Sequence, residues 1–126
     1  PKNWEGNKTE LRNFLFSLPK GKKIWMEIQS LVYGKYMRKA QLMPNVLNFF
    51  KLCKEREYNL YIISHKTELG HFDTEKISLR KEALKWMESK KFFDKDFVGL
   101  NRNKIFFANT RKQKVKIIHS TLDIIF

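Results

Sequence analysis

The sequence has few cysteines, prolines and glycines, and it is short of acidic residues. Cys53 is the only cysteine in 126 residues, which excludes an internal disulfide bond and fits a reducing, cytoplasmic location. The three prolines and five glycines form no low-complexity tract or flexible linker. No apolar run approaches the ~20 residues of a membrane span, and no signal peptide opens the chain. We therefore expect no membrane partner.

Basic residues outnumber acidic ones in the chain as a whole. Twenty-six Lys and Arg stand against thirteen Asp and Glu, which gives a formal net charge of +13. Such a charge favours anionic partners such as nucleic acid or a phosphorylated metabolite. The basic residues are scattered, so the solvated faces of helices would also explain them. Hydrophobic content of 42% and aromatic content of 14% indicate a packed core and one ordinary domain.

Residues 1–41 have the apolar spacing of a helical hairpin. One helix is predicted from Thr9 to Leu18, with Thr9 as its N-cap. A second helix is predicted from Lys23 to Met37. Its expected apolar side holds Ile24, Trp25, Ile28, Leu31, Val32 and Tyr36. The boundary between this hairpin and the rest of the chain is placed at residues 39–43.

Residues 42–126 alternate between predicted helices and strands. The predicted elements are a helix opened by Pro44, a strand Tyr58–Ser64, a helix Glu75–Ser89, a strand Lys104–Asn109, a helix Lys112–His119 and a strand Leu122–Phe126. This alternation predicts a parallel sheet with right-handed crossovers. The expected fold class is therefore α/β, with a Rossmann-like sheet covered by helices on both faces and a small helical cap. Cys53 is expected on the buried side of its helix.

Polar and basic residues follow two of the predicted strands. Ser64 ends the first strand, and Thr110 follows the second. Because ligands bind beyond the carboxyl ends of strands in an open α/β sheet, we expect a phosphate-handling site there. The candidate binding residues are His65, Lys66, Thr110, Arg111 and Lys112. A serine that merely ends a strand, and basic residues that merely face solvent, are the alternatives.

The order and spacing of four stretches resemble the haloacid dehalogenase-like (HAD-like) hydrolase superfamily. These stretches are residues 42–46, 60–64, 80–93 and 105–118. The resemblance covers residues 42–126, roughly two-thirds of the chain, and makes residues 1–41 a small helical cap. It implies a magnesium-dependent phosphate-monoester phosphatase that forms an aspartyl-phosphate. The implied partner is a small phosphorylated substrate.

The resemblance also implies roles for individual residues. Ser64 would donate a hydrogen bond to the phosphoryl oxygens, and Lys114 would stabilise their negative charge. Lys112 and then Arg111 are the alternatives to Lys114. His65, next to Ser64, could contact the substrate, and an unperturbed histidine changes its charge near pH 6.5.

Acidic residues are missing where the family chemistry needs them. No Asp-x-Asp follows a predicted strand ahead of the hairpin, and no acidic pair follows the last strand. Asp94 and Asp96 fall in a connecting loop, where Asp94 is expected to fix a turn, and Asp123 lies inside the last strand. We therefore expect a chain that is inactive alone, with no metal ligands, and read it as a fragment whose missing parts lie in flanking sequence.

Two other functions remain open from the sequence. A basic module could bind nucleic acid or another polyanion, with bases stacked on Trp4, Trp25 or Tyr36. Those aromatics would otherwise form the core of the hairpin. A degenerate HAD-like domain kept for protein interaction is the second alternative. The sequence leaves the oligomeric state and the identity of the substrate undetermined.

Overall fold

The computed structural model describes residues 4–70 and 75–121, which form a mixture of helices and strands. In chain order the elements are α1 (Lys8–Phe16), α2 (Gly21–Tyr33), η1 (Met37–Lys39), α3 (Val46–Glu55), β1 (Ile62–His65), α4 (Leu79–Ser89), η2 (Arg102–Lys104), β2 (Ile105–Ala108) and α5 (Arg111–Ser120). The predicted α/β class is confirmed at this coarse level. No helix in these ranges combines the length and apolar character that crossing a membrane requires.

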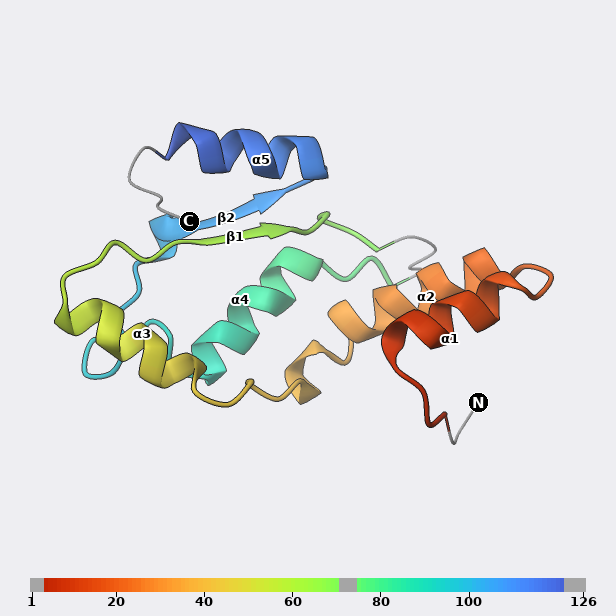
Figure 1. The fold of residues 1–126 in the computed structure, drawn as a ribbon, viewed down its shortest axis with the longest axis horizontal. Helices are drawn as coiled ribbons and strands as arrows, with labels where there is room; N and C mark the ends of the chain where they lie inside the picture. The colour runs from red at the N-terminus through yellow and green to blue at the C-terminus, as the bar shows by residue number, and fades with distance from the viewer. Residues whose placement is uncertain (1–3, 71–74, 122–126) are drawn as a thin grey trace.

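Helices α1 and α2 form the predicted hairpin (Figure 1). The N-cap of α1 is Asn7, so the assignment of Thr9 was wrong. Asn7 Oδ1 accepts a hydrogen bond from the Glu10 backbone N–H at 2.9 Å, and Glu10 Oε2 accepts one from the Asn7 N–H at 3.0 Å. This reciprocal capping box satisfies two N–H groups that a helix start otherwise leaves unpaired. Thr9 offers no such exchange because it already lies inside the helix.

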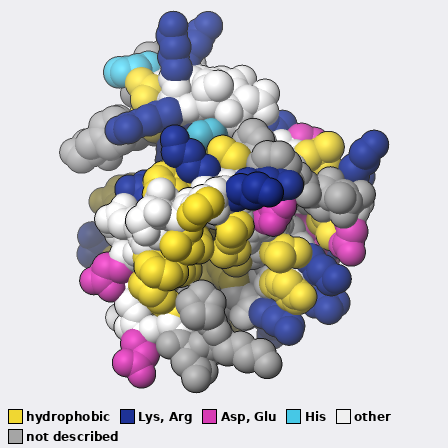
Figure 2. Space-filling model, turned by 90° about the vertical axis from the view of Figure 1, so that its right-hand side faces the viewer, with side chains coloured by type: hydrophobic (Ala, Val, Ile, Leu, Met, Phe, Trp, Pro, Cys, Tyr) yellow, Lys and Arg dark blue, Asp and Glu magenta, His cyan; other side chains and the backbone are white. Residues whose placement is uncertain are grey.

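Gly21 starts α2 in close contact with the end of α1. A Cβ atom built on Gly21 would lie 1.5 Å from the Leu15 carbonyl oxygen, so only glycine fits here. Trp25, one turn later, is buried. Part of the predicted apolar side of α2 is not buried, because Leu31 and Val32 are 45% and 49% exposed. Figure 2, which views the molecule from the hairpin end, shows hydrophobic side chains gathered on the surface. The helix ends at Tyr33, before Gly34, and not at Met37.

Strands β1 and β2 are parallel neighbours, as the alternation predicted. The register pairs Ile62 with Ile105 and continues to His65 with Ala108. Strand β1 begins four residues later than predicted and includes His65. Helix α5 contacts both strands, and the strands lie between α5 and α4 in Figure 1. The strand predicted for residues 122–126 falls outside the described residues.

An aromatic cluster joins α3, α4 and the loop after α4. Phe92 is buried, and its ring meets those of Phe50 and Trp86 edge-on, with centroids 5.1 and 5.7 Å away. Cys53 is also buried, as predicted. Helix α3 begins at Val46, so the placement of Pro44 in its first turn was wrong.

The loop after α4 contains the two neighbouring aspartates of the chain. Asp94 Oδ1 accepts a hydrogen bond from the Asp96 N–H at 2.9 Å, and the Asp94 carbonyl accepts one from the Gly99 N–H at 2.8 Å. Gly99 has a φ of +64°, a conformation that favours glycine. Asp94 therefore fixes a turn, as predicted.

Candidate functional site

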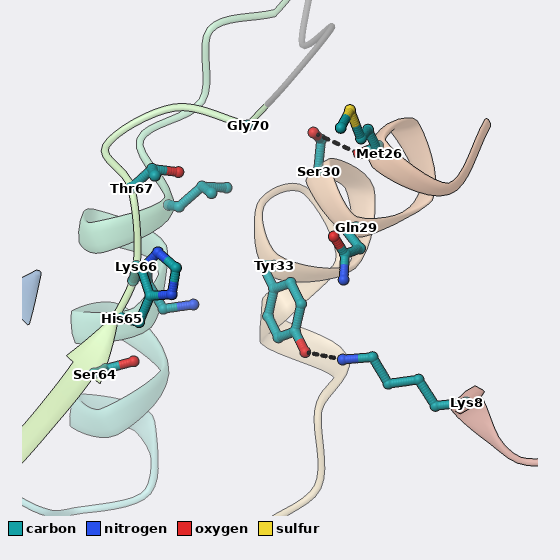
Figure 3. A pocket seen from close by; sticks show the side chains of 11 residues that line it. Lys8, Met26, Gln29, Ser30, Tyr33, Ser64, His65, Lys66, Thr67 and Gly70 are labelled. Carbon is teal, nitrogen blue, oxygen red and sulfur yellow. Dashed lines mark hydrogen bonds between the residues drawn. The ribbon is translucent and has the colours of Figure 1, made fainter. Parts of the chain in front are cut away.

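A pocket of about 490 Å³ lies between the helical hairpin and the carboxyl end of β1. We call it the hairpin pocket. Its lining residues are Lys8, Met26, Gln29, Ser30 and Tyr33 from the hairpin, Ser64 and His65 from β1, Lys66, Thr67 and Gly70 from the segment after β1, and Leu79 from α4. Figure 3 shows the hairpin residues on one wall and the β1 segment on the other. The pocket therefore lies at the carboxyl end of β1, and the phosphate-handling site expected there stays a prediction.

The β1 wall carries three of the predicted site residues. Ser64, His65 and Lys66 are consecutive, and all three line the hairpin pocket. Ser64 and Lys66 are partly buried, whereas His65 is exposed. A hydroxyl and an ammonium group on the same wall are both hydrogen-bond donors suited to an anion.

The hairpin wall presents Tyr33 between two lysines. Lys8 Nζ donates a hydrogen bond to the Tyr33 hydroxyl oxygen at 3.1 Å, as Figure 3 shows. Lys66 Nζ lies 4.5 Å from the centre of the Tyr33 ring, within the range of a cation–π contact. Burial lowers the pKa of Lys66, and the interaction with Tyr33 opposes this effect. Tyr33 therefore binds Lys8 within the hairpin and contacts the segment after β1 through Lys66.

Arg80, near the start of α4, connects the ends of the two strands. Its Nε donates to the Lys66 carbonyl oxygen at 3.0 Å, and its Nη2 donates to Asn109 Oδ1 at 2.6 Å. His65 Nε2 and the Asn109 carbonyl oxygen are 3.1 Å apart, a hydrogen bond in which the ring N–H donates. The Lys66 N–H donates to the Ala108 carbonyl at 2.9 Å. These contacts hold the segment after β1 against the segment after β2.

Four predicted site residues lie outside the hairpin pocket. Thr110, Arg111, Lys112 and Lys114 follow β2 and do not line it. Thr110 caps α5, with its Oγ1 accepting a hydrogen bond from the Gln113 N–H at 3.0 Å. Because the ends of β1 and β2 are neighbours, these residues occupy the same edge of the sheet. The assignment of Lys114 as the lysine of the active site remains a prediction.

Sequence reasoning did not select Lys8, Tyr33 or Arg80 as site residues. Lys8 and Tyr33 come from the hairpin. They are far from Ser64 along the chain, so the sequence does not indicate that these residues line one pocket. Arg80 is an unremarkable basic residue near a helix start. The one available signal was the polar side of the predicted helix, where Gln29 and Ser30 lie one turn before Tyr33, and it is weak.

The residues that line the hairpin pocket do not fit a magnesium ion. Mg²⁺ is held in proteins through carboxylates, and this pocket is lined by amines, hydroxyls, an imidazole, an amide and apolar groups. Over residues 4–70 and 75–121, no group of three or more His, Cys, Asp or Glu could hold a metal ion. We therefore derive no chemical step through a metal.

Comparison with known proteins adds no relative. No protein-family model, no curated protein and no solved structure matches this chain. A functional assignment therefore depends on the residues of the site and on the order of the secondary-structure elements.

Proposed function

We propose that this chain is the helical cap and part of the α/β core of a HAD-like phosphohydrolase. In this proposal the hairpin pocket binds the phosphoryl group of a small phosphorylated substrate. The observation that carries the proposal is the position of Ser64. It lies at the carboxyl end of β1, in a pocket that Lys66 also lines and to which the described structure brings no carboxylate.

A phosphate monoester is an anion that needs hydrogen-bond donors and positive charge around it. Its oxygens accept hydrogen bonds and carry negative charge, so a hydroxyl and an ammonium group stabilise them together. In a partly buried site these donors act more strongly than they would in water. They would also offset the repulsion that an attacking carboxylate meets at a phosphate dianion. Ser64 and Lys66 therefore match the recognition half of a phosphoryl-transfer site.

The order of elements supports the same proposal. A helical hairpin comes first, followed by α3, β1, the crossover helix α4 and the parallel strand β2. The hairpin lies beyond the carboxyl end of β1 (Figure 1), and both contribute residues to the hairpin pocket, where a cap would enclose a substrate. This order is the one that the family resemblance implies for a cap and the strands that follow it.

Among residues 4–70 and 75–121, no carboxylate that could attack the ester lines the hairpin pocket. The two neighbouring aspartates of the sequence, Asp94 and Asp96, form a turn after α4 instead of following a strand. We therefore assign phosphoryl recognition to residues 1–126 and not bond cleavage by these residues alone. In this proposal, residues outside the described part of the chain supply the nucleophile and any Mg²⁺ site.

A polyanion-binding module is the second candidate, favoured by the net charge of +13. The aromatic residues weaken it. Trp25 is 8% exposed and packs in the hairpin, and the ring of Trp4 meets that of Phe14 at 5.5 Å. Trp4 and Tyr36 are 36% and 42% exposed, and Lys39 Nζ lies 5.1 Å from the Tyr36 ring centre, so Tyr36 offers an exposed face beside a basic residue.

Titration with inorganic phosphate, followed by calorimetry, tests the leading proposal. Loss of one hydrogen bond of about 1.4 kcal/mol should weaken binding roughly tenfold in Ser64→Ala. Ser89→Ala is the matched control, because the Ser89 hydroxyl donates only to the Trp86 carbonyl at the far end of α4. Phosphate binding that is equal in the two variants would contradict the proposal. The second candidate would be favoured if the affinity for single-stranded DNA falls steeply with salt concentration and is the same in the wild type and in Ser64→Ala.

A further inference from the structure

Two cationic groups reach the hairpin pocket from parts of the chain that are far apart in sequence. Lys8 lies at the start of α1, and Lys66 follows β1. Their Nζ atoms lie 5.5 and 4.5 Å from the centre of the Tyr33 ring. Both residues line the same pocket, so both can act on one bound ligand.

Neither of these lysines has a carboxylate partner among residues 4–70 and 75–121. Elsewhere in these ranges, lysines form ion pairs at 3.2 to 3.9 Å, as Lys85 does with Glu82. Lys8 and Lys66 instead share the ring and hydroxyl of Tyr33. A tyrosine compensates a positive charge less completely than a carboxylate does. The hairpin pocket therefore has an excess of positive charge from two ammonium groups, and a ligand that carries two negative charges would neutralise both.

Tyr33 can also contribute directly to the binding of a ligand. Its hydroxyl oxygen accepts the hydrogen bond from Lys8, which leaves its own O–H proton able to donate. Gln29, one helical turn before Tyr33, lines the same wall and adds an amide (Figure 3). The hairpin wall thus offers an ammonium group, a hydroxyl and an amide, and the β1 wall offers a second ammonium group and a hydroxyl.

We propose that the hairpin pocket takes a substrate with two anionic groups. The first group is bound by Ser64 and Lys66, and the second is bound by Lys8 and the Tyr33 hydroxyl. The substrate class is thus a bisphosphate, or a phosphate monoester that also carries a carboxylate. The volume of about 490 Å³ lies within the range of small-molecule sites and is large enough for a phosphorylated sugar. This inference rests on the proposed function, because it takes the Ser64 end of the pocket as the phosphoryl site.

The experiment compares fructose 6-phosphate with fructose 1,6-bisphosphate, and uses inorganic phosphate as the reference. Calorimetric titrations of the wild-type chain should give at least tenfold tighter binding of the bisphosphate. Lys8→Met should reduce this preference to about twofold or less, because it removes the ammonium group that binds the second anionic group. Lys8 is exposed, so this variant should fold, and circular dichroism will verify it. Tyr33→Phe, which keeps the ring, should reduce the preference as well.

A control variant separates the effect of Lys8 in the pocket from the general attraction of a basic protein for anions. Lys116→Met removes one exposed positive charge from α5, away from the hairpin pocket, and should leave the preference intact. If Lys116→Met lowers the preference as much as Lys8→Met does, the inference is overturned. Equal affinity of the wild type for the two sugar phosphates also overturns it, and in that case Ser64-dependent phosphate binding would leave the proposed function standing. Absence of Ser64-dependent phosphate binding overturns both.

Discussion

Replacing Arg80 by alanine would remove the side chain that connects the ends of β1 and β2. Two hydrogen bonds would be lost, one to the Lys66 carbonyl at 3.0 Å and one to Asn109 Oδ1 at 2.6 Å. A more distant ion pair with Glu68, at 3.9 Å, would disappear with them. The variant would leave the Lys66 carbonyl, beside the proposed phosphoryl site, without this partner.

The expected loss of stability follows from the exposure of the side chain. Hydrogen bonds to charged groups contribute ~1.5–3 kcal/mol each when well buried. The Arg80 side chain is 26% exposed and Asn109 is exposed, so water partly replaces what is lost. We therefore take about 1 kcal/mol for each hydrogen bond and almost nothing for the ion pair, whose glutamate is more than half exposed. The expected decrease in the free energy of unfolding is about 2 kcal/mol.

Urea unfolding measured by circular dichroism gives this quantity directly. With a slope of ~2 kcal/mol per molar urea, the midpoint of Arg80→Ala should fall by roughly 1 M. Lys85→Ala is the matched control from the same helix. Its ammonium pairs with Glu82 and with no other carboxylate among the described residues, and its side chain is 72% exposed, so the expected change is within ~0.5 kcal/mol.

A midpoint for Arg80→Ala that equals that of Lys85→Ala would refute this reasoning. It would mean that the contacts of Arg80 contribute no more than an ordinary surface ion pair. An unchanged midpoint together with a changed slope would instead indicate a different unfolded or native ensemble. In that case, the hydrogen-bond argument would have to be abandoned as well.

Two further changes test the core and the electrostatics of the pocket. Phe92→Ala removes a ring that is 3% exposed and meets Phe50 and Trp86 edge-on, so it should cost ~3–5 kcal/mol in urea unfolding, and a loss below 1 kcal/mol would contradict the described packing. Burial lowers the pKa of Lys66 in the folded protein, so above that lowered value the unfolded chain binds more protons and stability rises as the pH approaches 10.5. Lys66→Met should abolish this part of the pH dependence. Unfolding midpoints of the wild type and the variant that run parallel from neutral pH to 10.5 would show that Lys66 is not desolvated.

Much of the fold could be predicted from the spacing of apolar residues. The hairpin, the parallel pair of strands and the crossover helix α4 all follow from local periodicity and from the rule that alternating helices and strands form parallel sheets. The predicted ends of the elements were less accurate, because side-chain hydrogen bonds determine where a helix begins. Asn7 with Glu10, and Ser78 with the Lys81 N–H, start their helices at positions that apolar spacing does not mark.

The candidate site could be predicted only where one strand carries it. Ser64, His65 and Lys66 are adjacent in sequence, and the end of a strand places them in a pocket. Lys8 and Tyr33 join them only through the packing of the hairpin against the segment after β1, which no local pattern encodes. The exposed apolar side of α2 has the same origin, because periodicity shows that a helix has an apolar face but not what covers it.

The most direct test of the account is a titration of the ¹⁵N-labelled chain with inorganic phosphate, followed by two-dimensional NMR. The account predicts that the largest amide shifts fall on Ser64 and Lys66, that Tyr33 also responds, and that Ser64→Ala greatly reduces all three. Shifts that spread evenly over the exposed lysines, or that persist unchanged in Ser64→Ala, would contradict the claim that the hairpin pocket recognises a phosphoryl group.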